Sequence, residues 1–297
     1  MNKKKGNRFV KFLIVFFSIC LLIFILLPGY VRNALLYQYP NIDDHKIFAN
    51  RIVEATDPVP LLQSSQYNKN LLPDSLLQNF IRYETVAFIV VQNDSLIHES
   101  YYDGFSETSI SNCFSATKSI VGLLIGFAIE DGYIKNLDQP VSDFIPEYKT
   151  SQNSRLTIRH LLTMSSGIKF SEKYNSLFSP TTKIYYGTDL KEQVQKQMVS
   201  HSPGMHFNYI SINTQILGTV ITEATGKTLS EYASEKLWGP LSASHDAHWS
   251  LDKKEGMEKA FCCFNATATD FARIGMLMCD SGVWKGQQVI PRSYYLA

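Results

Sequence analysis

The sequence predicts an α/β layer that carries a helical subdomain and follows an N-terminal transmembrane helix. Three observations support this fold class: an apolar run at 12–31, two short apolar runs around a polar turn at 86–102, and helical patterns in much of the remaining chain. The chain has 297 residues, 45% of them hydrophobic and 19% charged, which is enough to bury a large core. We therefore expect one large globular domain behind a membrane anchor.

The first 31 residues have the features of an uncleaved membrane anchor. Five Lys and Arg residues lie in a basic tail at 1–11, and the apolar run at 12–31 matches the ~20 residues that a spanning helix needs. This charge bias predicts a cytoplasmic tail, a single-pass helix and a periplasmic or otherwise extracytoplasmic domain. No small-x-small cleavage site follows, which disfavours a signal peptide. A buried core helix and lipoprotein processing at Cys20 are minor alternatives.

The chain after the anchor divides into a lead-in and a main domain. Residues 32–80 predict a linker and lead-in that ends in the short amphipathic segment "SLLQNFIRY", and residues 81–297 form the main domain. Near its start, "VAFIVV" at 86–91 and "SLIHESYY" at 95–102 are rich in apolar and β-branched residues. Because only the polar "QND" separates them, they predict a β-hairpin.

Three later segments predict helices with recognisable ends. "TIRHLLTMSSG" is expected to end at Gly167, and "NTQILGTVITEATG" is expected to end at Gly226. "NATATDFARIGMLMCDSG" has Asn265 or Thr267 as its N-terminal cap and Gly282 past its end. Together with the apolar helix after the hairpin, they predict helices around a sheet and a helical subdomain between.

The overall charge argues against a nucleic-acid partner. The formal net charge is only +1, and no basic stripe with interleaved aromatic residues is present. His245 and His248 could supply two metal ligands, but no third candidate lies near them in the sequence. We therefore expect neither nucleic-acid binding nor a metal site.

Four cysteines follow the anchor, at positions 113, 262, 263 and 279, and they could pair in three ways. Adjacent cysteines such as Cys262 and Cys263 seldom bridge each other. Burial as small apolar side chains explains all four at least as well as disulfide bonding. No function is assigned to them from the sequence.

The spacing S-x-x-K occurs three times, and context separates the three. The pairs are Ser115–Lys118, Ser166–Lys169 and Ser250–Lys253. Ser166 precedes a glycine that more readily stops a helix than starts one, and Ser250 lies in a charged loop. Only Ser115 opens a strong apolar helix.

The helix that follows Ser115 directs Lys118 inward. Apolar residues at 121, 124, 125, 128 and 129 form one buried stripe, and Lys118 lies on the same side with Ser115 one turn before it. Burial disfavours the charged form of lysine, so the amine can accept a proton from a neighbouring hydroxyl. The alternative from this helix alone is that Ser115 is only an N-cap and that Lys118 extends to solvent.

Several segments in order resemble the serine β-lactamase and penicillin-binding-protein superfamily. They are "FSATKS", "LTIRHLLTMSSG" and "PGMHFNYISINTQILGTVITEATGKTLSEY". "YYGTDL", "HDAHWSLD" and "NATATDFARIG" resemble most closely the class C type esterases and the 6-aminohexanoate-dimer (nylon-oligomer) hydrolases within it. The resemblance runs from about residue 80 to the end. It implies a β-lactamase/transpeptidase-like α/β (α+β) fold, with an antiparallel sheet flanked by helices and a helical subdomain.

The resemblance also implies a mechanism and its residues. Ser115 is the implied nucleophile, Lys118 the general base, and Tyr209 the residue that passes a proton to the leaving group. Tyr209 and Ser211 form a Y-x-S motif, the form that resembles the nylon-oligomer branch. Without the resemblance, Tyr209 would be interpreted as a core tyrosine. The implied substrate is a small-molecule amide or ester, and no metal or organic cofactor is required.

Candidates for the substrate cleft are weaker. Ser211, Tyr185, Tyr186 and Asp189 are expected to line it, although the last three could equally form a satisfied helix terminus. They do not identify a substrate.

Two departures from the superfamily pattern limit this expectation. Residues 262–264, "CCF", stand where relatives commonly have a Gly-Gly pair. The third motif, a Lys or His followed by Ser or Thr and Gly on a strand, is absent from the printed sequence, so we expect the C-terminal strands to be missing. The alternatives are an inactive truncated or binding-only homologue, and a cell-wall D,D-peptidase that shares the same motifs.

Overall fold

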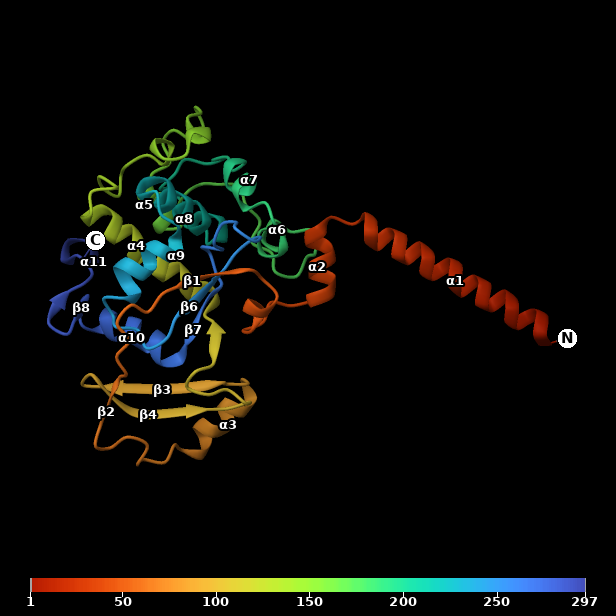
Figure 1. Cartoon of the computed structure of the whole chain (residues 1–297). Coiled ribbons are helices and arrows are strands. Elements are labelled where there is room, and N and C mark those ends of the chain that lie inside the picture. The colour runs from red at the N-terminus through yellow and green to blue at the C-terminus, as the bar shows by residue number, and fades with distance from the viewer. Residues whose placement is uncertain (1, 297) are drawn as a thin grey trace.

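A computed structural model describes the backbone of residues 2–296 and the side chains of residues 9–296 (Figure 1). Helix α1 (Asn2–Leu26) projects away from the folded body, and helix α2 (Gly29–Tyr37) follows it directly and packs on the body. Within α1, residues Phe9–Leu26 have a mean hydropathy of 3.0, and none of them is buried by the rest of the protein. The helix is long and apolar enough to cross a membrane.

The central sheet has four antiparallel strands in the order β1-β6-β7-β5. Its strands are β1 (Asn50–Val53), β5 (Ile110–Asn112), β6 (Ala247–Ser250) and β7 (Phe264–Thr267). Strand β5 leads into the helix that carries Lys118, and β7 follows the two adjacent cysteines. The pairing of β5 with β7, in which Asn112 lies opposite Asn265, therefore brings together two segments that lie about 150 residues apart in the chain.

The expected hairpin is present, and it forms a second sheet at one side of the body (Figure 1). The strands of this sheet are β2 (Leu62–Gln63), β3 (Ala87–Gln92) and β4 (Ser95–Tyr101), and helix α3 (Asp74–Arg82) lies between β2 and β3 in the chain. The turn has two residues rather than three, because Gln92 still pairs with Ser95. Asn93 and Asp94 both have positive φ angles, 49° and 58°, which is typical of tight hairpin turns.

Helices cover the central sheet and form the helical subdomain. They are α4 (Thr117–Glu130), α5 (Ile158–Leu162), α6 (Pro180–Tyr186), α7 (Leu190–Gln195), α8 (Ser211–Thr225), α9 (Leu229–Ala233), α10 (Ala268–Cys279) and α11 (Arg292–Tyr295), with a small hairpin of β8 (Val283–Trp284) and β9 (Gln287–Gln288). Helix α8 ends at Gly226, whose φ of 69° suits a left-handed cap.

The expected end of the helix in "TIRHLLTMSSG" was wrong. Helix α5 stops at Leu162 with Thr163 as its C-cap, and Gly167 lies in the following loop with a φ of 69°. A side chain at Gly167 would meet the carbonyl oxygen of His201 at 2.2 Å, so this glycine permits a close approach of two loops.

Helix α10 begins as its sequence predicts. Thr267 caps it by accepting a hydrogen bond from the Asp270 N–H, and Asp270 forms a buried ion pair with Arg273 at 3.0 Å. The Asp270 carboxylate also accepts hydrogen bonds from the backbone N–H groups of Ser244 and His245, at 2.7 and 3.1 Å. The motif "NATATDFARIG" therefore joins β7 and α10 to the loop before β6.

Residues 32–80, expected as a linker and lead-in, contribute helix α2 and strand β1 to the folded body. Strand β1 pairs with β6 through Asn50 to Val53. Close by, Tyr185 donates a hydrogen bond from its hydroxyl to the buried carboxylate of Asp44 at 2.6 Å. Burial raises the pKa of Asp44, and this contact ties the lead-in to helix α6.

A buried lysine gives this region a pH-dependent stability. Lys259 is inaccessible to solvent, its Nζ donates to the Tyr185 carbonyl oxygen at 2.8 Å, and burial lowers its pKa from 10.5 to about 7. Between these two values the unfolded chain binds more protons than the folded chain. The free energy of unfolding should therefore rise with pH across this window, by up to about 1.4 kcal/mol per pH unit.

Urea unfolding of the detergent-solubilised protein across that window measures this contribution. Lys259→Met should make the rise clearly shallower, whereas Lys253→Met, at an exposed lysine, should preserve it. An equal slope in wild type and Lys259→Met would contradict the assignment.

Candidate active site

The turn that carries Ser115 is fixed by a left-handed residue and a buried asparagine. Ser115 lies in a single 3₁₀ turn (Phe114–Ala116) that runs directly into α4. Phe114 has a φ of 45°, which is strained for a bulky side chain and is a feature often found at functional sites. Asn112 Oδ1 holds this turn by accepting hydrogen bonds from the backbone N–H groups of Phe114 at 2.7 Å and Cys263 at 3.1 Å.

Lys118 lies against Ser115 one helical turn later. Its Nζ is 3.1 Å from Ser115 Oγ and donates to the Phe261 carbonyl oxygen at 2.8 Å. Burial lowers the pKa of Lys118, and nearby Tyr209 opposes part of that shift. A lysine with a lowered pKa beside a hydroxyl can accept the hydroxyl proton, so this pair has the geometry of a base and a nucleophile.

Tyr209 approaches the same lysine from a different segment. It lies just before helix α8, and its ring centroid is 5.2 Å from Lys118 Nζ. The side chain remains 40% exposed, so the phenol lies at the surface of the site rather than in the core. The three residues that the sequence put forward for catalysis thus lie together in the folded chain.

The other two S-x-x-K serines use their hydroxyls elsewhere. Ser166 donates to Asn213 Oδ1 at 2.8 Å, and Ser250 donates to Asn50 Oδ1 at 2.8 Å. Both serines are buried. Their hydroxyl groups therefore contribute to packing, while the Ser115 hydroxyl lies next to Lys118.

Ser211 is held by a residue that the sequence analysis did not find. Glu172 accepts hydrogen bonds from the Ser211 backbone N–H at 2.9 Å, from the Ser211 hydroxyl at 2.6 Å and from the Tyr174 hydroxyl at 2.7 Å. A carboxylate at the start of α8 also suits the positive end of the helix dipole. Glu172 lies in a loop 39 residues before Ser211, and no local pattern marks it.

Two cavities meet at the Ser115–Lys118 pair. The larger, of about 630 Å³, is lined by Tyr185 and Tyr186, and also by Ser211. The smaller, of about 350 Å³, is lined by Tyr209, and both cavities include Ser115 and Lys118. These volumes lie in the range of small-molecule sites.

Asp189 is placed differently from the other cleft candidates. It precedes helix α7, where its carboxylate accepts from Gln193 Nε2 at 2.8 Å and lies 3.5 Å from Lys183 Nζ. Neither cavity includes it among its described lining residues. The structure therefore shows Asp189 in the helix-terminus role that the sequence left open.

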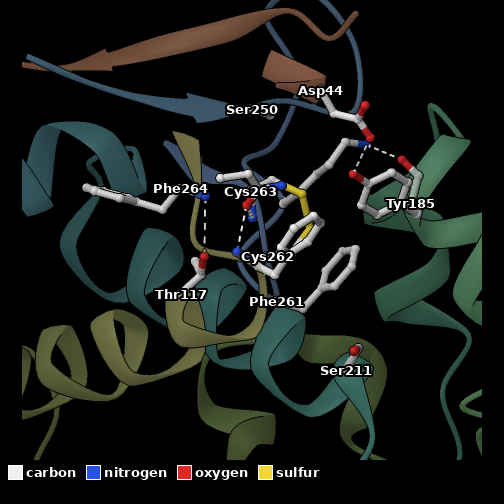
Figure 2. The surroundings of a disulfide bond; sticks show 12 residues. Asp44, Thr117, Tyr185, Ser211, Ser250, Phe261, Cys262, Cys263 and Phe264 are labelled. Carbon is white, nitrogen blue, oxygen red and sulfur yellow. Dashed lines mark hydrogen bonds between the residues drawn. A yellow bond between two sulfur atoms is a disulfide. The ribbon is translucent and has the colours of Figure 1, made fainter. Parts of the chain in front are cut away.

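The expectation for the adjacent cysteines was wrong, because Cys262 and Cys263 form a disulfide bond (Figure 2). Cys263 has a φ of 71°, so the chain turns between the two residues instead of continuing as a strand. Just after the bond, the Phe264 N–H donates to Thr117 Oγ1 at 3.3 Å, as Figure 2 shows. The disulfide thus lies between the carbonyl that contacts Lys118 and the strand that anchors the helix of Lys118.

A metal site would require several His, Cys, Asp or Glu side chains close together. Among the residues whose side chains are described, no group of three or more His, Cys, Asp or Glu side chains could hold an ion together. His245 instead contributes its backbone N–H to Asp270, as described above.

The chain belongs to the Beta-lactamase family, whose model matches residues 74–274. One curated relative, the 6-aminohexanoate-dimer hydrolase of Paenarthrobacter ureafaciens, is 29% identical over 234 residues, which are 75% of this chain and 59% of that protein. Protein flp of Staphylococcus aureus is 30% identical over 143 residues, which are 47% of this chain and 28% of that protein. The chain thus spans less than two thirds of these relatives.

Solved structures show the same fold. A Bacillus anthracis structure provisionally named a 6-aminohexanoate-dimer hydrolase superposes with a TM-score of 0.75 at 22% identity, over 88% of this chain and 73% of that one. A class C β-lactamase superposes with a TM-score of 0.52 at 19% identity, over 74% and 67% of the two chains. The expected β-lactamase-like α/β fold is therefore confirmed, and the family supports a serine hydrolase in general.

Proposed function

We propose that the protein is a membrane-anchored serine hydrolase that cleaves an amide or ester bond through an acyl-enzyme on Ser115. The observation that carries this proposal is the position of Lys118 Nζ, 3.1 Å from Ser115 Oγ and held by the Phe261 carbonyl oxygen. Burial lowers the pKa of Lys118, which increases the neutral fraction of the amine that can act as a base.

Acylation would proceed by addition and elimination at the substrate carbonyl. Ser115 Oγ–H gives its proton to Lys118 Nζ while Oγ bonds to the carbonyl carbon, and a tetrahedral oxyanion forms. Ser115 precedes the N-terminus of helix α4, so the positive end of that helix favours the developing charge. The bond to the leaving group then breaks, and water later attacks the acyl-enzyme to release the acid.

Tyr209 is the proposed route for the proton to the leaving group. Its ring lies 5.2 Å from Lys118 Nζ, and it lines the smaller cavity next to Ser115. A phenol beside an ammonium group can pass a proton from the lysine to a departing amine or alkoxide, which resets Lys118 for deacylation.

Helix α1 is the proposed anchor. Residues Phe9–Leu26 are apolar and unburied, and the basic residues before them favour a cytoplasmic N-terminus with the hydrolase domain on the far side of the membrane. The proposed substrate is a small molecule, and no metal or organic cofactor takes part in the proposed steps.

Covalent labelling tests the proposal directly. A fluorophosphonate probe should add one adduct per chain to the detergent-extracted protein, and peptide mapping should place it on Ser115. Ser115→Ala should remove the adduct, whereas Ser166→Ala, at a buried serine with the same S-x-x-K spacing, should keep it. Binding of an ester substrate without formation of an adduct would favour a binding-only homologue. Cleavage of the stem peptides of peptidoglycan would favour a D,D-peptidase.

A further inference from the structure

The segment that directly follows helix α1 forms one wall of the larger cavity. Ala34 and Leu35 of α2, together with Gln38, Tyr39 and Pro40 just beyond it, line this cavity along with Ser115. The position of Leu35, seven residues after Pro28, corresponds to ~10 Å of helix. Helix α2 is the part of the folded body that lies next to α1, as Figure 1 shows. The larger cavity is therefore bounded by the segment that follows the proposed anchor.

Specific contacts hold this wall in place. Asn33 Nδ2 donates to the Tyr186 carbonyl oxygen at 3.1 Å, and the rings of Tyr37 and Tyr186 stack with centroids 6.4 Å apart. Val31 and Ala34 are buried against the body. Helix α2 is thus an integral wall of the site, and a bound substrate would contact it.

The cavity is suited to an uncharged, apolar group. Its lining is dominated by aliphatic and aromatic side chains, among them Leu35, Tyr39, Phe114, Leu177, Tyr186 and Phe261. Among its described lining residues, Lys118 alone carries a charge, and that residue already contacts Ser115 and Phe261. A charged tail would find no counter-ion here other than Lys118, whereas an alkyl chain would lose its contact with water against the apolar part of the lining.

The rim of the cavity exposes apolar side chains on the side of the anchor. Leu35 is 42% exposed, Tyr39 78% and Tyr174 65%, and all three line the cavity. Tyrosines are common where a protein meets the membrane–water interface. An exposed apolar rim a few turns from a spanning helix suits a mouth that faces the lipid surface.

The position of Tyr209 indicates which cavity would hold the acyl group of a substrate and which would hold its leaving group. Tyr209, the proposed proton donor to the leaving group, lines the smaller cavity and not the larger one. The leaving group is therefore assigned to the smaller cavity, and the acyl group to the larger one on the other side of Ser115.

We propose that the substrate is an ester or amide of an apolar acyl chain, that the acyl chain occupies the larger cavity, and that such amphiphiles enter from the membrane surface along α2. This inference rests on the proposed hydrolase function. It adds the class of substrate and the direction of entry.

A series of esters tests the assignment of the acyl chain. With p-nitrophenyl esters below their micellar concentration, kcat/KM of the full chain should rise about threefold per methylene as the acyl chain lengthens from acetyl toward octanoyl. With acetate esters of alcohols of the same lengths, the increase should be much shallower, because the alcohol lies in the smaller cavity. Equal slopes in the two series would overturn the assignment.

Two neighbouring leucines of α2 provide matched variants. Both are exposed, but Leu35 lines the cavity and Leu36 does not. Leu35→Asn should lower the octanoyl-to-acetyl ratio of kcat/KM by about tenfold, because the acyl chain would lose apolar contact equivalent to roughly two methylenes. Leu36→Asn should leave this ratio unchanged. Equal effects of the two substitutions would argue against an acyl chain on this wall.

A binding measurement separates failure of this inference from failure of the hydrolase proposal. A fluorescent long-chain fatty amide should bind the Ser115→Ala protein, more weakly when Leu35→Asn is added and equally well when Leu36→Asn is added. If wild type hydrolyses acetyl ester but shows neither length dependence nor this binding, only the inference is overturned. If no ester is hydrolysed through Ser115 and the amide still binds, only the hydrolase proposal fails.

The source of the amphiphile is tested in vesicles of phosphatidylcholine that carry the full chain. A non-exchanging long-chain ester placed in the same vesicles should be hydrolysed faster than the same ester placed in separate vesicles. Equal rates would show that the chain takes free amphiphiles from water, which would overturn entry along the membrane.

Discussion

Replacement of Lys118 by Met should lower kcat/KM for ester hydrolysis by about a thousandfold, within the 10²–10⁴ range that general-base catalysis contributes. Methionine has a comparable length and fits the same partly buried space, but it cannot accept the Ser115 proton. Lys118→Arg should fail as well, because a guanidinium group remains protonated. Steady-state kinetics on a short-chain ester measure both effects.

The pH dependence distinguishes a lost base from a disturbed fold. Burial lowers the pKa of Lys118 below its ordinary value of 10.5, so in wild type the rate should rise with pH and level off below that value. The residual activity of Lys118→Met should lack this rise. Lys169→Met, at the exposed lysine of another S-x-x-K pair, should keep both the rate and the profile. Activity of Lys118→Met within tenfold of wild type would remove Lys118 from the mechanism.

Asp270→Ala should reduce the free energy of unfolding by about 3–5 kcal/mol, the usual cost of leaving one partner of a buried ion pair alone. Arg273 is only 1% exposed, and the substitution would remove its counter-charge at 3.0 Å. Two backbone N–H groups, those of Ser244 and His245, would lose their acceptor as well. Urea denaturation of the detergent-solubilised protein measures the loss.

An exposed pair of the same residue types serves as the control. Asp138 and Arg159 form a bidentate ion pair at 2.8 and 2.9 Å, with side chains that are 65% and 43% exposed. Asp138→Ala should therefore leave the unfolding midpoint nearly unchanged. The double variant Asp270→Ala/Arg273→Met should lose less than the single variant, since no unpaired charge remains. A single variant as stable as wild type would contradict the buried-pair assignment.

Local patterns predicted the elements whose determinants lie within about one helix or hairpin. The hairpin at β3 and β4 follows from two β-branched runs and a polar turn, and α10 follows from Thr267 and its apolar pattern. The pairing of Ser115 with Lys118 is local in the same sense, because the two residues lie one turn apart on one helix. Motif order then supplied the family, which the match over residues 74–274 shows.

Contacts between distant segments were beyond sequence reasoning. Glu172 reaches Ser211 across 39 residues, and β1 joins the central sheet at β6 across about 200 residues. Helix α5 ends at Leu162, and Gly167 lies instead where two loops meet, a contact that no local pattern marks. The wall formed by α2 was hidden for the same reason, since residues 32–80 have the composition of a lead-in.

The bond between Cys262 and Cys263 differs from most disulfides in how little it adds to the free energy of unfolding. A disulfide between neighbouring residues closes almost no loop, so it removes little entropy from the unfolded chain and adds little to global stability by that route. The bond constrains the peptide group between Cys262 and Cys263, one residue beyond Phe261, whose carbonyl oxygen accepts a hydrogen bond from Lys118. Reduction of the bond should therefore alter the backbone next to this contact far more than it alters the free energy of unfolding.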